Sequence, residues 1–402
     1  MQSLRQLYKI GYGPSSSHTM GPGKAARRFR QAFPQADSFR AHLYGSLALT
    51  GQGHGTDRAL RREFEPLSCE VIFDTQPQPL PHPNTFDLIA LEQGRILGQW
   101  RVLSIGGGDI MREGDPLPIP AEVYPHRNFT AVLDCCAVGR IRLWQYVQEA
   151  EGEEIWEYLG QVWRTMQEAV RRGLRTEGVL PGGLELERKA GYLYRQRHID
   201  ESPTTRENRL ICSYAYAVAE ENAGGGLVVT APTCGSCGVL PAVLLYQQEK
   251  HGFSDRQILQ ALAAAGIVGT VIKTNASVSG AECGCQAEIG SACSMAAAAL
   301  GELFELSLAE IEYAAEIAME HMLGLTCDPV CGLVQIPCIE RNAVAAMRAI
   351  NAVSLADFLS DTRKISFDVV VRTMYETGRD MPGKYRETST GGLASLYGKS
   401  GE

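Results

Sequence analysis

The sequence predicts an α+β fold in two parts. Residues 1–120 combine short strand-like runs with turns, and residues 121–402 are mostly helical. Two observations support this division. Runs of β-branched and apolar residues bounded by glycine and proline occur in the first part, whereas later segments rich in alanine and leucine are apolar nearly all round, as buried helices are. A chain of 402 residues is also long enough for two or three domains.

The first part contains two clear strand candidates, at residues 69–73 and 96–105. Alternating prolines at positions 77 to 83 predict an exposed loop between them. A helix is expected from about Gly21 to Phe33, because its body is made largely of good helix formers and Pro34 would end it. This part therefore mixes strands with at least one helix.

The second part follows a segment rich in proline, residues 114–125, which we interpret as an interdomain linker. Residues 141–172 have apolar side chains at helical spacing. The longest apolar run, residues 261–272, is too short to span a bilayer and predicts a buried helix. Capping-box patterns that begin at Ser254 and Ser307 predict two helix starts.

The balance of charged residues argues against one class of binding partner. The chain has 38 basic and 46 acidic residues, a net charge of −8, which argues against nucleic acid as the main partner because phosphate binding needs a basic face. No signal peptide and no membrane span are recognisable at the sequence level, so we expect a cytoplasmic protein without a membrane partner. Twelve cysteines in such a chain favour metal binding or catalysis over disulfides.

Three cysteines occur in polar, turn-prone segments. Cys285 follows glycine, Cys327 precedes Asp-Pro, and Cys338 follows proline. Such neighbours place a thiolate near free backbone N–H groups, which stabilise the charge on sulfur. The segments indicate a metal site, although their spacing does not identify the metal.

Other cysteines have simpler interpretations. Cys234-Gly-Ser-Cys237 has the gap of a zinc knuckle or a redox dithiol, but no second ligand pair of suitable spacing accompanies it. We expect Cys212, Cys234, Cys237 and Cys293 to be small buried hydrophobic residues, the commonest fate of free cysteine.

Two loops carry a histidine among polar residues. Gly13-Pro-Ser-Ser-Ser-His-Thr19 precedes the first predicted helix, and its hydroxyls and N–H groups suit a carboxylate or a phosphate. It is not a Walker A loop, because Lys24 is followed by alanine. His54 lies between two glycines, so we expect its ring at an exposed loop tip, with Asp57 near enough to orient it for acid–base chemistry.

Several motifs then identify a family. The segments 280–290, 324–329 and 334–342 resemble the cluster-binding segments of the iron–sulfur L-serine dehydratases in their single-chain form. Both histidine loops resemble signature loops of the same family. Further similar segments cover nearly the whole chain, at residues 179–183, 230–233, 273–280 and 387–392.

The resemblance implies conversion of L-serine to pyruvate and ammonia by a lyase that is a homodimer with a compact N-terminal α/β domain. It implies that a 4Fe-4S cluster is held by Cys285, Cys327 and Cys338 and acts as a Lewis acid. His54 would be the base, and His18 would help to hold or protonate the substrate. The remaining expected substrate contacts are polar side chains: Ser15, Ser16, Ser17, Thr19, Thr233, Asn275 and Ser277.

Two departures and three alternatives accompany this hypothesis. Cys234-Gly-Ser-Cys237 stands where many relatives have Asn-Gly-Ala-Ala, and no cysteine follows Cys338, whereas some relatives end with one. A pyridoxal-phosphate dehydratase using Lys273 would leave the polar cysteine segments unexplained. A zinc or redox sensor would leave the histidine loops unexplained. The same chemistry on L-threonine, L-cysteine or another β-substituted amino acid stays open.

Overall fold

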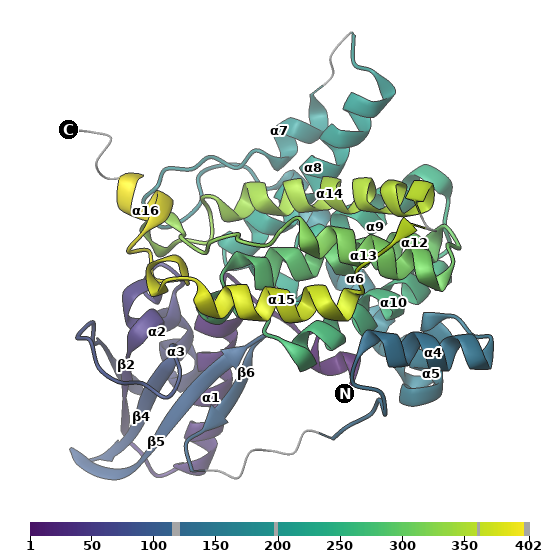
Figure 1. The fold of residues 1–402 in the computed structure, drawn as a ribbon. Helices are drawn as coiled ribbons and strands as arrows, with labels where there is room; N and C mark the ends of the chain where they lie inside the picture. Colours follow the sequence, from purple (N-terminus) through teal and green to yellow (C-terminus); the bar gives the residue numbers. More distant parts are fainter. Residues whose placement is uncertain (115–120, 197–199, 360–361, 398–402) are drawn as a thin grey trace.

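The computed structural model describes residues 1–114, 121–196, 200–359 and 362–397. Figure 1 shows a sheet with its own helices beside a larger helical body, which confirms the predicted α+β class. Residues 115–120 of the predicted linker, which spans residues 114–125, lie outside the described residues.

A five-stranded sheet forms the centre of the first part, in the order β3-β2-β4-β5-β6. Strands β2 and β3 are parallel, and the other neighbours are antiparallel. Strands β3 and β5 confirm the two predicted from the sequence. The strands span β2 (Ser38–Leu43), β3 (Ser68–Phe73), β4 (Thr85–Glu92), β5 (Arg95–Gly106) and β6 (Asp109–Arg112).

Helices α1 (Gly21–Ala32), α2 (Gly45–Thr50) and α3 (Thr56–Phe64) accompany this sheet. They share a core with it, in which the Phe39 ring stacks on Phe64 at a centroid distance of 4.1 Å. Helix α1 confirms the helix expected from Gly21 and ends at Ala32, two residues before Pro34.

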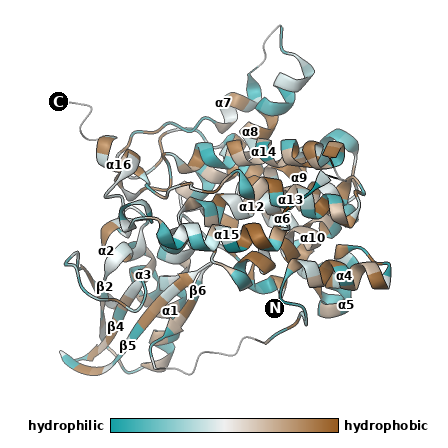
Figure 2. Ribbon diagram, in the orientation of Figure 1, coloured by the Kyte–Doolittle hydropathy of each residue, from teal (hydrophilic) through white to brown (hydrophobic). Residues whose placement is uncertain are grey.

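The second part is an α-helical body around one large core. The predicted capping boxes at Ser254 and Ser307 are present at the starts of α10 and α13. Hydrophobic residues recur along these helices and along strands β4 and β5 (Figure 2). The helices are α4 (Phe129–Gly139), α5 (Leu143–Glu151), α6 (Glu154–Arg175), α7 (Ala190–Arg195), α8 (Pro203–Ala223), α9 (Val239–His251), α10 (Asp255–Asn275), α11 (Gly280–Cys283), α12 (Ser291–Leu303), α13 (Leu308–Glu320), α14 (Cys338–Leu359), α15 (Phe367–Asp380) and α16 (Gly392–Tyr397).

Helix α10 contains the buried apolar run, residues 261–272. Among the described residues it alone is long and apolar enough to cross a membrane, and 72% of its apolar stretch is buried inside the protein. It packs against α12 and α6. The apolar run at residues 261–272 is therefore a core helix, as the sequence predicts.

The N-terminal segment belongs structurally to the helical body. Strand β1 (Ile10–Tyr12) pairs antiparallel with β7 (Leu227–Val229), and Leu4, Leu7 and Tyr8 are buried in the helical core. The Tyr8 hydroxyl donates a hydrogen bond to the backbone carbonyl of Leu262 at 2.9 Å. The chain thus starts in the helical body, builds the sheet, and then returns.

Candidate active site

The serine-rich loop positions His18 at the start of α1. Residues Ser16–Met20 form one π-helical turn, and the Ser15 hydroxyl caps it by accepting a hydrogen bond from the His18 N–H at 3.1 Å. The ring is fully buried, with Nδ1 2.9 Å from the Ser17 hydroxyl and Nε2 3.1 Å from the Ser46 hydroxyl. The hydroxyls of this loop therefore orient a histidine.

His54 lies in the turn between α2 and α3. Its ring is 1% exposed, and Nδ1 lies 2.9 Å from the carbonyl oxygen of Thr50. Because a carbonyl only accepts, this contact requires the proton on Nδ1 and leaves Nε2 as the basic nitrogen. Thr19 fixes the turn by donating its hydroxyl to the His54 carbonyl at 2.8 Å.

The expectation of an exposed loop tip is wrong for His54. A Cβ on Gly53 would lie 2.5 Å from the carbonyl oxygen of Gly332, so this glycine lets the turn press against the helical body. Asp57 does not orient the ring either, because its carboxylate pairs with Arg61 at 2.8 Å. The glycines beside His54 therefore allow its ring to be buried rather than exposed.

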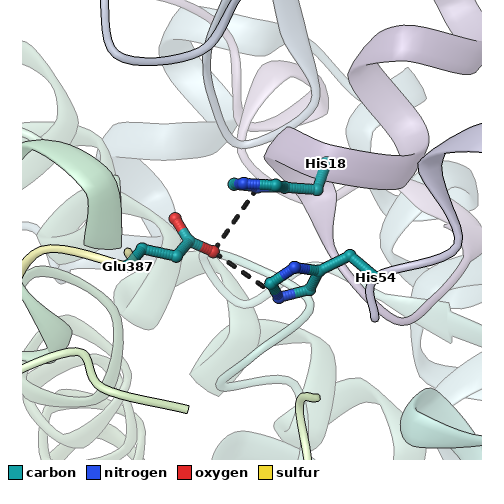
Figure 3. Close-up of side chains that lie close together, drawn as sticks. All are labelled: His18, His54 and Glu387. Carbon is teal, nitrogen blue, oxygen red and sulfur yellow. Dashed lines mark ion pairs between the residues drawn. The ribbon is translucent and has the colours of Figure 1, made fainter. Parts of the chain in front are cut away.

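A carboxylate completes the histidine cluster. Glu387 Oε1 lies 3.5 Å from Nδ1 of His18 and 3.8 Å from Nε2 of His54 (Figure 3). The two imidazole centroids are 4.5 Å apart. Backbone hydrogen bonds hold Glu387 in place: its N–H donates to the Cys327 carbonyl at 2.8 Å, and its carbonyl accepts from the Ser46 hydroxyl at 2.6 Å.

Sequence reasoning matched the segment that contains Glu387 but assigned this residue no role. Its available signal was a motif rich in hydroxyl residues and glycine, Glu387-Thr-Ser-Thr-Gly-Gly392. The backbone of Glu387 has φ of 56°, which is uncommon for a residue with a side chain and concentrates at functional sites.

Burial sets the protonation of this cluster. It lowers the pKa of His54 to about 4 and that of His18 well below its usual value. Both imidazoles are therefore neutral at neutral pH. Burial also raises the pKa of Glu387 well above the usual carboxyl range, with the nearby Glu288 carboxylate adding to the effect.

The three predicted cysteines converge on one cavity. Cys285 follows α11, Cys338 begins α14, and Cys327 donates its N–H to the Tyr385 carbonyl at 2.7 Å. The Sγ atoms of Cys285 and Cys327 and a carboxylate oxygen of Glu288 lie within 4.8 Å of one another. Cys338 lines the same cavity.

Arg341 supplies positive charge to these thiols. It lies one turn after Cys338 in α14, and its guanidinium donates to the Thr326 carbonyl at 2.6 Å. A hydrogen bond from Cys327, assisted by Arg341, lowers the pKa of Cys285 to about 6. The Cys285 thiolate in turn raises the pKa of Cys327, and burial raises that of Cys338.

These residues fit an iron–sulfur cluster with three protein ligands. Soft thiolates select iron–sulfur clusters, Zn²⁺ or Cu⁺, and a buried cation beside them stabilises their charge. Cys283 does not belong to this donor set, because it packs against the backbone position of Gly378 and lines no part of the cavity. Buried Cys234, Cys237 and Cys293 agree with the expectation, whereas Cys212 is only half-buried.

One cavity joins the histidine and cysteine clusters. Its wall comes from the serine loop and His54 on one side, the three cysteines and Glu288 on the other, and Glu387 between them. Of the expected substrate contacts, Ser15 lines the cavity. Thr233 lies beside Glu288 and 3.1 Å from the Ser236 hydroxyl.

The other five expected contacts do not line this cavity. Ser16, Ser17 and Thr19 are buried in the turn that carries His18, and the remaining two lie elsewhere. Asn275 donates its side-chain amide to the backbone carbonyls of Arg127 and Val271, at 2.6 and 2.9 Å. Ser277 donates to the Glu282 carboxylate and lines a different cavity. Lys273, the residue that a pyridoxal-phosphate enzyme would need, forms an ion pair with Asp109 at 2.7 Å.

Comparisons with known proteins agree with this arrangement. The family model described as serine dehydratase alpha chain matches residues 85–394, and the serine dehydratase beta chain model matches residues 3–65. The chain is 40% identical to L-serine dehydratase of Haemophilus influenzae, over 98% of this chain and 99% of that protein. It is also 40% identical to L-serine dehydratase 2 of Escherichia coli and to L-serine dehydratase of Streptomyces coelicolor, with 98% of each chain covered in both comparisons.

Proposed function

Because the chain belongs to the serine dehydratase family, we propose that it is an L-serine ammonia-lyase that converts L-serine to pyruvate and ammonia. The observation that carries this proposal is the shared cavity. The neutral His54 and the side chain of Glu387 face three thiols across this cavity, and His18 packs against His54 with ring centroids 4.5 Å apart. Dehydration needs both a base at Cα and an electrophile at the β-hydroxyl, and this arrangement offers a place for each.

The electrophile in this proposal is a 4Fe-4S cluster held by Cys285, Cys327 and Cys338. When bound, a cluster with three protein ligands supplies one iron that lacks a protein ligand and can act as a Lewis acid on the substrate hydroxyl. Arg341 offsets the negative charge of the thiolates. Glu288 is the nearest additional oxygen donor in the wall.

His54 is the proposed base. Its Nδ1–H is committed to the Thr50 carbonyl, so Nε2 has a free lone pair toward Glu387 and the cavity. Nε2 takes the Cα proton, the Cα–H electrons form the Cα=Cβ bond, and the Cβ–O bond breaks to release hydroxide. The aminoacrylate product then tautomerises to an imine, and water hydrolyses it to pyruvate and ammonium.

The serine loop has a supporting role in this scheme. Ser15 and Thr233 are the proposed substrate contacts, because they reach the shared cavity or its wall. Ser17 orients the ring of His18, and Thr19 fixes the turn of His54. The neutral His18, whose ring packs against that of His54, would help to hold the substrate indirectly, through His54, without placing a buried positive charge beside it.

Anaerobic purification followed by iron, sulfide and pyruvate measurements tests the proposal. We expect about four irons per chain and pyruvate from L-serine without added cofactor. L-threonine and L-cysteine serve as parallel substrates, because each has a β-leaving group. Zinc in place of iron, or turnover that depends on added pyridoxal phosphate, would contradict the proposal.

A further inference from the structure

Three lysines converge on one carboxylate at the junction of the two parts. Asp109, the first residue of β6, lies 2.5 Å from Lys9 Nζ, 3.5 Å from Lys24 Nζ and 2.7 Å from Lys273 Nζ. Lys24 comes from α1 beside the sheet, and Lys273 from the last turn of the core helix α10. The reaction proposed above uses none of these four residues.

With all three lysines protonated, one carboxylate leaves this cluster with an excess of two positive charges, and loss of the Lys9 proton reduces the excess to one. The lysine side chains are only 14%, 37% and 19% exposed, so water screens them incompletely. Burial, followed by repulsion from the Lys273 ammonium, lowers the pKa of Lys9 to about 7. Like charges so close together are unfavourable unless an anion joins them.

The cluster forms part of the wall of a large cavity. The space, about 730 Å³ and partly open to solvent, is lined by Lys24, Asp109 and Lys273. Arg28 and Arg127 add two more cations to the lining. Arg127 pairs with Glu122 at 2.8 Å, whereas Arg28 has no carboxylate partner among the residues that the structure describes.

The rest of the lining suits an organic body rather than a bare ion. Apolar side chains from both parts of the protein form one wall: Ile105, Ile110, Met111, Val123 and Val278. Ligand pockets of this size combine such walls with a few charged groups that fix orientation. None of these residues lines the cavity that joins the histidines and the cysteines, so the two sites are separate.

We propose that this junction cavity binds a small organic dianion, a dicarboxylate or a phosphate monoester, through Lys24, Lys273 and Arg28. The two ligand classes share the chemistry that ammonium and guanidinium groups recognise. The ligand would bridge α1 of the first part and α10 of the second. The Glu282 carboxylate in the same lining is already engaged, because it accepts a hydrogen bond from Ser277 and lies 3.2 Å from His82 Nε2. This inference does not depend on the proposed function.

Calorimetric titration of the full chain tests the site directly. Succinate is the dicarboxylate probe and glycerol 3-phosphate the phosphate probe, each added at constant ionic strength because exposed charges are screened by salt. We expect saturable binding of one probe class at one site per chain. Arg28→Gln and Lys24→Gln should each weaken it by about tenfold, as loss of one charge-assisted contact does.

Lys250→Gln is the matched control. Lys250 is an exposed lysine on α9 that pairs with Glu207 at 3.1 Å, away from the cavity. Circular dichroism checks that each variant folds. Arg28 is exposed, so Arg28→Gln still tests the site if Lys24→Gln does not fold. Absence of saturable binding for both probes would overturn the proposal. Equal weakening by Lys250→Gln and Arg28→Gln would do the same.

Discussion

Helix α6 contains two glycines whose surroundings differ sharply. A Cβ on Gly173 would lie 2.1 Å from the carbonyl oxygen of Ala217 in α8 and 2.5 Å from its carbonyl carbon. A Cβ on Gly160 would meet only the end of the Arg164 side chain, at 3.5 Å. Gly→Ala at the two positions therefore separates helix propensity from packing within a single helix.

The two effects have estimable magnitudes. Alanine in a helix interior is favoured over glycine by about 1 kcal/mol, and this gain applies at both positions. At Gly173 the methyl group must move α6 about 1 Å away from α8, because an ordinary van der Waals contact needs at least 3.4 Å. The atoms it meets belong to the backbone of α8, which has no side-chain rotation to relieve the contact. Overpacking of this kind costs about 3 kcal/mol. We expect Gly173→Ala to lose about 2 kcal/mol of unfolding free energy, and Gly160→Ala to gain up to about 1 kcal/mol.

Urea unfolding followed by tryptophan fluorescence measures both variants, because Trp156 and Trp163 lie in α6. The midpoint should fall for Gly173→Ala and rise for Gly160→Ala, with unchanged slopes. If Gly173→Ala proved as stable as Gly160→Ala, the close approach of α6 and α8 would not be the reason that glycine is needed there.

Three further outcomes follow from the site. His54→Asn should lower pyruvate formation by about 10²- to 10⁴-fold while the visible absorption of the cluster is retained, and His251→Asn, on the exposed end of α9, should change neither. Cys338→Ser should lower the iron content measured after anaerobic purification, whereas exposed Cys331→Ser should keep it. Acid should destabilise the fold through His54. Between its unfolded pKa of about 6.5 and its folded pKa of about 4, the unfolded chain binds a proton that the folded chain excludes. The contribution of His54 to the unfolding free energy should therefore fall by about 2 kcal/mol from pH 7 to pH 5. It is measured as the difference in unfolding free energy between the unchanged chain and His54→Asn, from urea midpoints at the two pH values.

Local signals in the sequence predicted much of the fold. The start of α10 can be predicted from Ser254 and Gln257 alone. In this capping box each side chain accepts a hydrogen bond from the other residue's backbone N–H, all within one turn. The strand at residues 69–73 was likewise readable from its composition and its bounding turns. Such features depend on neighbours only a few residues away.

Features set by distant contacts were not predictable in this way. The burial of His54 depends on Gly332, and the hydrogen bonds that hold Glu387 come from Ser46 and Cys327. No periodicity in a single segment encodes such pairings. The same holds for β1, whose partner β7 follows more than 200 residues later.

The pairing of β1 with β7 has a consequence for the order of events during translation. About 220 residues separate Ile10 from its partner Val229. At roughly 5–20 residues per second, the ribosome needs about 10–40 s to make that stretch. The sheet and its helices, whose core lies within residues 25–102, can close in the meantime. Leu4, Leu7 and Tyr8 must wait with their apolar surfaces unburied, so this short leading segment is where a nascent-chain chaperone would find its target.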